Sequence, residues 1–167
     1  MKQVGLKYGV ICGLVYIIVG LIGILAGINS GGSSLAYVLL AVMIGATFYV
    51  IYLGCKEYRD EVNGGALTIG DGVKLGLFIA FIAGIMGALF NLLYNNVIDP
   101  EMMETQMEAA RDQLEERGMD DASIDTAMKI SKIMQSPAVT ILWTSLWGLV
   151  KGLIAAAILK KDAPPAA

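Results

Sequence analysis

The chain has 167 residues, 56% of them apolar, with 12 basic and 15 acidic residues and a formal net charge of −3. It contains no histidine, so chemistry built around the most common general base, proton shuttle and transition-metal ligand is excluded. This length and apolar content predict a single integral membrane domain over residues 1–167, with no second globular domain.

Four apolar runs are long enough to cross a membrane as helices. Residues 8–28, 35–55 and 75–98 carry no charge, and residues 138–159 carry only Lys151. At a rise of about 1.5 Å per residue, each run matches a hydrocarbon core of about 30 Å. The sequence therefore predicts an all-α, four-helix transmembrane bundle.

Basic residues are distributed unevenly around the four runs. The turn at residues 29–34 has no charge, whereas seven basic residues flank the opposite ends of the runs. These seven are Lys2, Lys7, Lys56, Arg59, Lys74, Lys160 and Lys161. Because cytoplasmic loops are enriched in Lys and Arg, we expect a multi-pass protein with N and C termini in the cytoplasm.

Small residues recur every four positions in three of the runs. The longest row, along the helix expected for the third run and its start, consists of Gly72, Gly76, Ala80, Gly84 and Ala88. Since lipid provides no hydrophobic force between helices, such rows let backbones approach closely, which makes the third helix the expected packing hub. We expect these rows to pack helices of the same chain against one another. The alternative is that they pack helices of different copies in a homo-oligomer.

A polar segment of 39 residues separates the third and fourth runs. It has four basic and ten acidic residues, a formal charge of −6. Asp99 and Pro100 are typical of a helix start, because Asp caps the first turn and Pro lacks an N–H that would be unsatisfied there. Gly118 is expected to end this helix, and a second is expected over residues 123–135. We predict an extramembrane amphipathic helical hairpin over residues 99–135.

Six of the nine methionines lie in this hairpin. Met103, Met107 and Leu114 share one face of its first helix. One interpretation is that the first-helix methionines pack against Met128 and Met134 and close the hairpin, because methionine fills irregular gaps. The alternative is an adaptable docking surface for a partner, with Met103, Met107, Leu114 and Met128 as its contacts.

A Cu(I) site on thioether ligands is a third interpretation of these methionines. Its donors would be Met102, Met103, Met107 and Met119. Soft-metal sites usually add Cys or His ligands, and the hairpin contains neither. We therefore expect no metal and no cofactor.

Lys151 is the only charged residue within a predicted span. Charges at membrane depth are costly and often mark functional sites. One interpretation is that the Lys151 stem crosses apolar surface and its ammonium reaches the membrane interface. The alternative is a ligand or lipid site formed with Tyr16 and Tyr49, in which Thr47 is a further hydrogen-bond candidate and Asp71 a candidate counter-ion.

Two polar segments are expected to have structural roles. Asn91, Asn95 and Asn96, near the end of the third run, are expected to hydrogen-bond to hydroxyls of the fourth run. The candidate hydroxyls belong to Thr140, Thr144 and Ser145. Residues 56–71, between the second and third runs, are glycine-rich but lack a phosphate-loop pattern, so we expect a flexible turn.

Several short motifs, taken in order, resemble one bacterial family. They are Glu57-Tyr58-Arg59, Asn63-Gly64-Gly65, the GDGVKLG of residues 70–76, the NNVIDPE of residues 95–101, and Ser136-Pro137 before the last run. This order resembles domain-of-unknown-function family 4199 over nearly the whole chain. The resemblance implies a small four-helix protein of the bacterial inner membrane, and it assigns no catalytic residue.

The function expected from these patterns is binding. No external nucleophile is spaced to pair with a base, so we expect no enzyme and assign no catalytic residue. We expect an accessory or scaffold subunit in the lipid bilayer whose acidic hairpin binds a periplasmic or membrane protein, with no nucleic acid among its partners. The alternative is a small transporter or lipid-binding or ligand-binding protein that uses Lys151.

Overall fold

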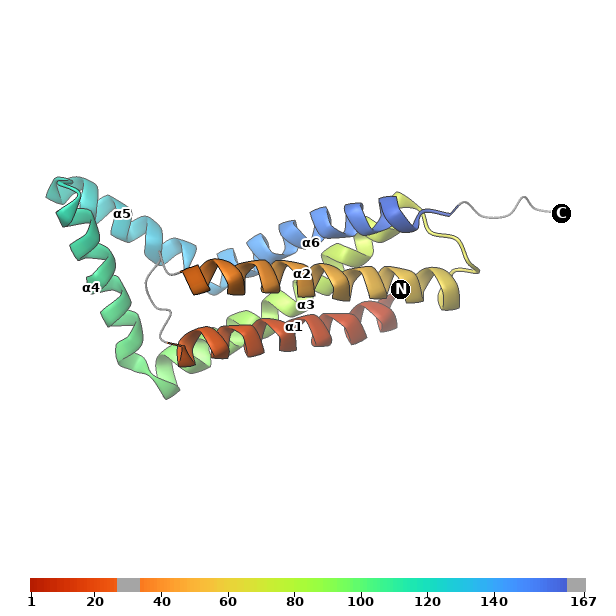
Figure 1. Ribbon diagram of the computed structural model, residues 1–167, viewed down its shortest axis with the longest axis horizontal. Helices are drawn as coiled ribbons and strands as arrows, with labels where there is room; N and C mark the ends of the chain where they lie inside the picture. Colours follow the sequence, from red (N-terminus) through yellow and green to blue (C-terminus); the bar gives the residue numbers. More distant parts are fainter. Residues whose placement is uncertain (27–33, 162–167) are drawn as a thin grey trace.

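The computed structural model describes residues 1–26 and 34–161, so residues 29–33 of the charge-free turn predicted at residues 29–34 lie outside this part. The described part contains six α-helices and no β-strand (Figure 1). The helices are α1 (Lys2–Leu25), α2 (Ser34–Glu57), α3 (Ile69–Leu93), α4 (Pro100–Glu116), α5 (Asp121–Met134) and α6 (Pro137–Leu159). Two π-helical turns, η1 (Tyr58–Val62) and η2 (Tyr94–Ile98), extend α2 and α3.

Four of these helices are long and apolar enough to cross a membrane. They are α1, α2 with η1, α3 with η2, and α6. Each contains one of the four apolar runs, except that α1 ends at Leu25, before residues 26–28 of the first run, and residues 27 and 28 lie outside the described part. The all-helical prediction and its four candidate spans are confirmed.

The four long helices run side by side, with α3 as the hub (Figure 1). Its most extensive contact is with α6, followed by its contact with α1. Both contacts use the small residues. An added Cβ on Gly76 would lie 2.6 Å from the Cα of Gly152, a backbone atom that cannot move aside. A Cβ on Gly9 would lie 2.7 Å from the Cβ of Ile82. The rows of small residues therefore determine how closely these helices approach.

Buried and exposed apolar side chains are arranged as expected for a protein surrounded by an apolar medium. The buried core includes Ile51, Leu75 and Ile79. Many large apolar side chains of the long helices face outward, such as Ile18, which is 55% exposed, and Leu142, which is 70% exposed. A water-soluble monomer rarely exposes so large an apolar surface. The arrangement is compatible with a membrane protein.

The segment between α2 and α3 packs closely against the end of α6. Leu67 is fully buried, and it exchanges two backbone hydrogen bonds with Lys161. Thr68 and Asp71 form a reciprocal capping box at the start of α3. The expectation of a flexible turn is wrong, because apolar burial and backbone pairing hold this segment in place.

Helices α4 and α5 lie at the opposite end of the long helices. The predicted start at Pro100 is confirmed, and Gly118, with a φ of +75°, lies in the turn between the two helices. Figure 1 shows α4 crossing the direction of the long helices, meeting α5 at this turn and diverging from it toward them. The two helices therefore form a wedge that opens toward the ends of α3 and α6.

Candidate functional site

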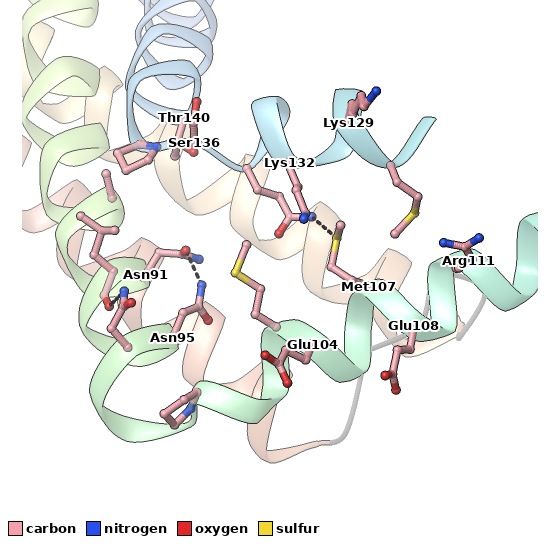
Figure 2. A pocket seen from close by; sticks show the side chains of 18 of the residues that line it. Asn91, Asn95, Glu104, Met107, Glu108, Arg111, Lys129, Lys132, Ser136 and Thr140 are labelled. Carbon is pink, nitrogen blue, oxygen red and sulfur yellow. Dashed lines mark hydrogen bonds between the residues drawn. The ribbon is translucent and has the colours of Figure 1, made fainter. Parts of the chain in front are cut away.

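A cavity of about 850 Å³ lies inside this wedge. Its walls come from α4 and α5, and its base from the ends of α3 and η2 and the start of α6 (Figure 2). We call this cavity the hairpin cleft. Its volume falls within the range of ligand and peptide pockets, so it is large enough to enclose several side chains of a partner.

Methionines from both hairpin helices line the hairpin cleft. Met103 and Met107 come from α4, and Met128 comes from α5. All three side chains are half-buried, and Gln135 donates a weak hydrogen bond to the Met107 sulfur over 4.0 Å. Leu114 is also half-buried, but it does not line the cleft.

The interpretation in which the methionines close the hairpin does not fit this geometry. Met103, Met107 and Met128 border an open cavity, and Met134 is 54% exposed. The backbones of α4 and α5 diverge from the turn that joins them (Figure 1). The methionines instead present a soft, polarizable wall of the kind that adapts to different apolar side chains.

Charged residues around the hairpin cleft are balanced, although the hairpin as a whole is acidic. Glu104, Glu108 and Asp125 line it together with Arg111, Lys129 and Lys132. Figure 2 shows Met107 of α4 and Lys132 of α5 facing one another across the cavity. An apolar wall with mixed charges at its margin suits an amphipathic occupant better than a free ion.

Arg111 links the two helices electrostatically. It donates a 3.1 Å hydrogen bond to Glu115 on α4, and its guanidinium lies 3.8 Å from Asp125 on α5. The hydrogen bond with Glu115, aided by nearby acidic residues, raises the pKa of Arg111 above its ordinary value. These groups are exposed, so their main effect is to orient side chains at the cleft margin.

The asparagines at the base of the cleft do not bond across to α6. Asn95 donates to Asn91 over 2.8 Å, and Asn96 donates to the carbonyl of Leu92 over 2.8 Å. The hydroxyls expected to pair with them bond within α6 instead: Thr144 donates to Thr140 and Ser145 to Ile141. The prediction of cross-helix bonds is therefore wrong. Polar side chains on helices often satisfy themselves on the preceding turn.

Lys151 occupies a separate polar cluster among the long helices. It is only 8% exposed, and its ammonium donates a 2.5 Å hydrogen bond to Thr47. The interpretation in which Lys151 extends to the membrane interface is wrong, and the predicted partner Thr47 is confirmed. Tyr16 is half-buried and its hydroxyl approaches Thr47, whereas Tyr49 is 60% exposed on another face of α2. The structure therefore brings Tyr16, but not Tyr49, to this cluster.

The candidate counter-ion of Lys151 is engaged elsewhere. Asp71 accepts a 2.6 Å hydrogen bond from the Thr68 hydroxyl and a 3.3 Å bond from its backbone N–H. Within residues 1–26 and 34–161, no carboxylate lies within ion-pair distance of Lys151. The buried ammonium is held by a neutral hydroxyl.

The donors of the copper alternative are spread over the hairpin. Met103 and Met107 line the cleft, while Met119 is 37% exposed near the turn. The side chain of Met102 lies outside the described part. In the part that is described, no group of three or more Cys, Asp or Glu side chains is placed to hold a metal ion.

Comparison with known proteins identifies a family for the chain. No curated protein and no solved structure matches the chain. A family described as "Protein of unknown function (DUF4199)" matches residues 7–161, which include all four candidate spans almost completely and the whole hairpin. The chain belongs to this family.

Proposed function

We propose that the chain is a multi-pass protein of the bacterial inner membrane. In this proposal its single domain is a four-helix transmembrane bundle with both termini in the cytoplasm and the α4–α5 hairpin on the periplasmic side. The support is the outward apolar surface of the long helices and the position of Lys56, Arg59 and Lys74 at the end opposite the hairpin.

The proposed role is that of a non-enzymatic accessory or scaffold subunit. The hairpin cleft would hold an amphipathic segment of a partner protein, with the partner's apolar side chains against the methionine wall. The observation that carries this role is the open cavity of about 850 Å³ lined by Met103, Met107 and Met128. Methionine-rich surfaces accept partners by repacking, and the balanced charges at the margin can orient the segment.

Charge substitutions in the cleft test the role directly. In the Met107→Glu/Met128→Glu variant, a bound segment would have to cover two carboxylates, so partner capture should fall by on the order of tenfold or more. The measurement is quantitative mass spectrometry of proteins that co-purify in mild detergent. Met134→Glu is the matched control, because Met134 is on α5 but outside the cleft lining. If the double variant and Met134→Glu captured equal amounts of the partner, the hairpin cleft would not be the binding site for the partner.

The orientation is tested separately with an impermeant maleimide on intact spheroplasts. Gln113→Cys on α4 and Glu61→Cys in η1 replace exposed residues at opposite ends of the protein, while native Cys12 and Cys55 are buried. Gln113→Cys should be labelled at once, and Glu61→Cys only after permeabilisation. The reverse pattern would overturn the proposed orientation.

A second candidate function is supported by the buried cluster around Lys151. An ammonium with only a neutral partner can bind a carboxylate or phosphate that supplies the missing negative charge. The test is mass spectrometry of lipids and metabolites that remain bound to the wild-type protein and to Lys151→Met. A small anionic molecule that is bound to the wild-type protein and absent from Lys151→Met would support this function. If the same molecules were bound to both proteins, this function would be rejected.

A further inference from the structure

A second cavity, of about 620 Å³, lies along the side of the long helices. Its wall is formed by Leu77, Phe78 and Phe81 of α3 and by Ile141 and Leu142 of α6. We call it the side groove. It is separate from the hairpin cleft, because the two cavities share no lining residue.

The side groove is elongated along the helices. Lys74, Leu77, Phe78 and Phe81 follow the i, i+3, i+4, i+7 spacing of one helical face. Helix α6 runs antiparallel to α3, with Ile141 opposite Gly84, so Ala138 lies beyond Gly84 toward the hairpin. From Lys74 to the level of Ala138 is about 14 residues of α3, or roughly 20 Å. This exceeds one leaflet of a hydrocarbon core about 30 Å thick.

Two lysines stand at the end of the side groove that is farther from the hairpin. Lys2 comes from α1 and Lys74 from α3, and both side chains are exposed. Neither forms an ion pair within the described ranges 1–26 and 34–161. The groove lining contains no Asp or Glu that could neutralise them. The groove therefore combines an apolar wall with an unneutralised positive end.

We propose that the side groove binds an anionic phospholipid, with an acyl chain along the phenylalanine wall and the phosphate between Lys2 and Lys74. This rests on the membrane position proposed above, in which the lysines lie at the cytoplasmic leaflet. Charge complementarity selects this occupant: a neighbouring transmembrane helix would fill the apolar wall but leave both ammonium groups unneutralised. Juxtamembrane lysines attract anionic headgroups strongly enough to make binding selective.

The test compares two lipids with identical acyl chains, phosphatidylglycerol and phosphatidylcholine, by native mass spectrometry of the full-length protein in a neutral detergent. The wild-type protein should retain phosphatidylglycerol preferentially. Each lysine near a membrane surface contributes about a fivefold preference, so Lys2→Gln/Lys74→Gln should reduce it by roughly 25-fold. Lys56→Gln is the matched control, because it removes an exposed lysine from α2 outside the groove.

A second variant tests the apolar half of the groove. Leu77 is 41% exposed, so the larger side chain of Leu77→Trp can occupy the groove without entering the core. It should displace both lipids while leaving the melting temperature near that of the wild-type protein. Partner capture by the hairpin cleft should be unchanged in all these variants.

The proposal is overturned if the wild-type protein retains both lipids equally, or if Lys56→Gln lowers retention as much as the double lysine variant. Unchanged retention in Leu77→Trp would also overturn it, since the acyl chain would then lie elsewhere. If these lipid tests fail but the maleimide labelling follows the expected pattern, only the lipid site is rejected and the proposed membrane orientation stands. Reversed labelling removes the membrane orientation on which the site depends.

Discussion

The ammonium of Lys151 and the hydroxyl of Thr47 share a buried hydrogen bond of 2.5 Å between α6 and α2. The same Thr47 hydroxyl donates a 2.7 Å bond to the carbonyl of Met43. The Thr47 hydroxyl thus donates a hydrogen bond within α2 and accepts one from Lys151 of α6. The arrangement joins two helices that are far apart in the chain.

Replacing Thr47 with Val should destabilise the protein. The Lys151 ammonium would lose its acceptor, and leaving a buried donor unsatisfied costs about 1–3 kcal/mol or more when it is charged. The free energy of unfolding, measured by SDS titration in mixed micelles, should fall accordingly.

Lys151→Met provides the control in a double-mutant cycle. An apolar residue of similar length should be neutral or stabilising at this buried position. In the Lys151→Met background, Thr47→Val should cost less than about 1 kcal/mol, because no ammonium remains to be satisfied. Equal costs in the two backgrounds would show that the hydrogen bond does not couple the helices.

Adding one methyl group at Gly76 should separate α3 from α6. Its Cβ would lie 2.6 Å from the Cα of Gly152, so the helix backbones would have to move apart. We expect Gly76→Ala to cost at least about 1–3 kcal/mol, as overpacking commonly does. Gly87→Ala on the same helix is the control, since nothing lies within 4 Å of its added Cβ. Thermal melts should therefore show a loss only for Gly76→Ala.

The start of α5 should be sensitive to acid through Asp120. Its carboxylate accepts bonds from the Ser123 hydroxyl at 2.5 Å and the Ser123 backbone N–H at 3.3 Å, which lower the pKa of Asp120 below the ordinary 3.8. A lowered pKa means that the carboxylate stabilises the folded helix above the unfolded value. That contribution is lost as pH falls through the folded value. The protection of the first-turn amides of α5, measured against their intrinsic exchange rates, should therefore fall below about pH 4.

Asp120→Asn separates this effect from the titration of other acids. Asparagine is also a good N-cap but has no proton to gain. The difference in first-turn protection between the two proteins should shrink or reverse on acidification. Identical pH profiles would assign the acid sensitivity to other carboxylates of the hairpin.

Leu67 should contribute strongly to stability despite its place in a connecting segment. It is fully buried, and Leu→Ala changes in cores cost about 2–5 kcal/mol. Val62→Ala, at a position 52% exposed in the same segment, should change stability by less than about 0.5 kcal/mol. A small effect of Leu67→Ala in the SDS titration would mean that this segment opens before the helices separate.

The positions of helices were predictable because their signals are local. Apolar runs determine the spans, and Asp99, Pro100 and Gly118 are enough to delimit α4 closely. The close contacts of α3 followed from the spacing of residues such as Gly76. The depth of Lys151 in its span also identified Thr47 as a partner.

Rotation of the helices about their own axes was not predictable. α2 is apolar on all sides, so its sequence does not show which face is buried, and Thr47 and Tyr49 point to different faces. The same uncertainty affected Asn91 and Asn95, which bond to one another and not to α6. The position of a residue along a span predicts its depth in the span. When a helix is apolar on all sides, the sequence does not predict which face of the helix turns toward the core.

The hairpin cleft was missed for a related reason. Its lining residues Met103, Met107 and Met128 were identified, but their use depends on the divergence of α4 from α5. That divergence depends on where α3 and α6 place the two ends of the hairpin, which is a long-range property. No local motif encodes it.

The pairing of Leu67 with Lys161 also orders events during synthesis. Leu67 leaves the ribosome early, but its backbone partners arrive only after the hairpin and α6 have been made. Until then, α3 can enter the bilayer but its loop cannot reach its final packing. We therefore expect truncation before Lys161 to leave the α2–α3 connection open to proteases, so that closure of this loop reports the synthesis of α6 and Lys161.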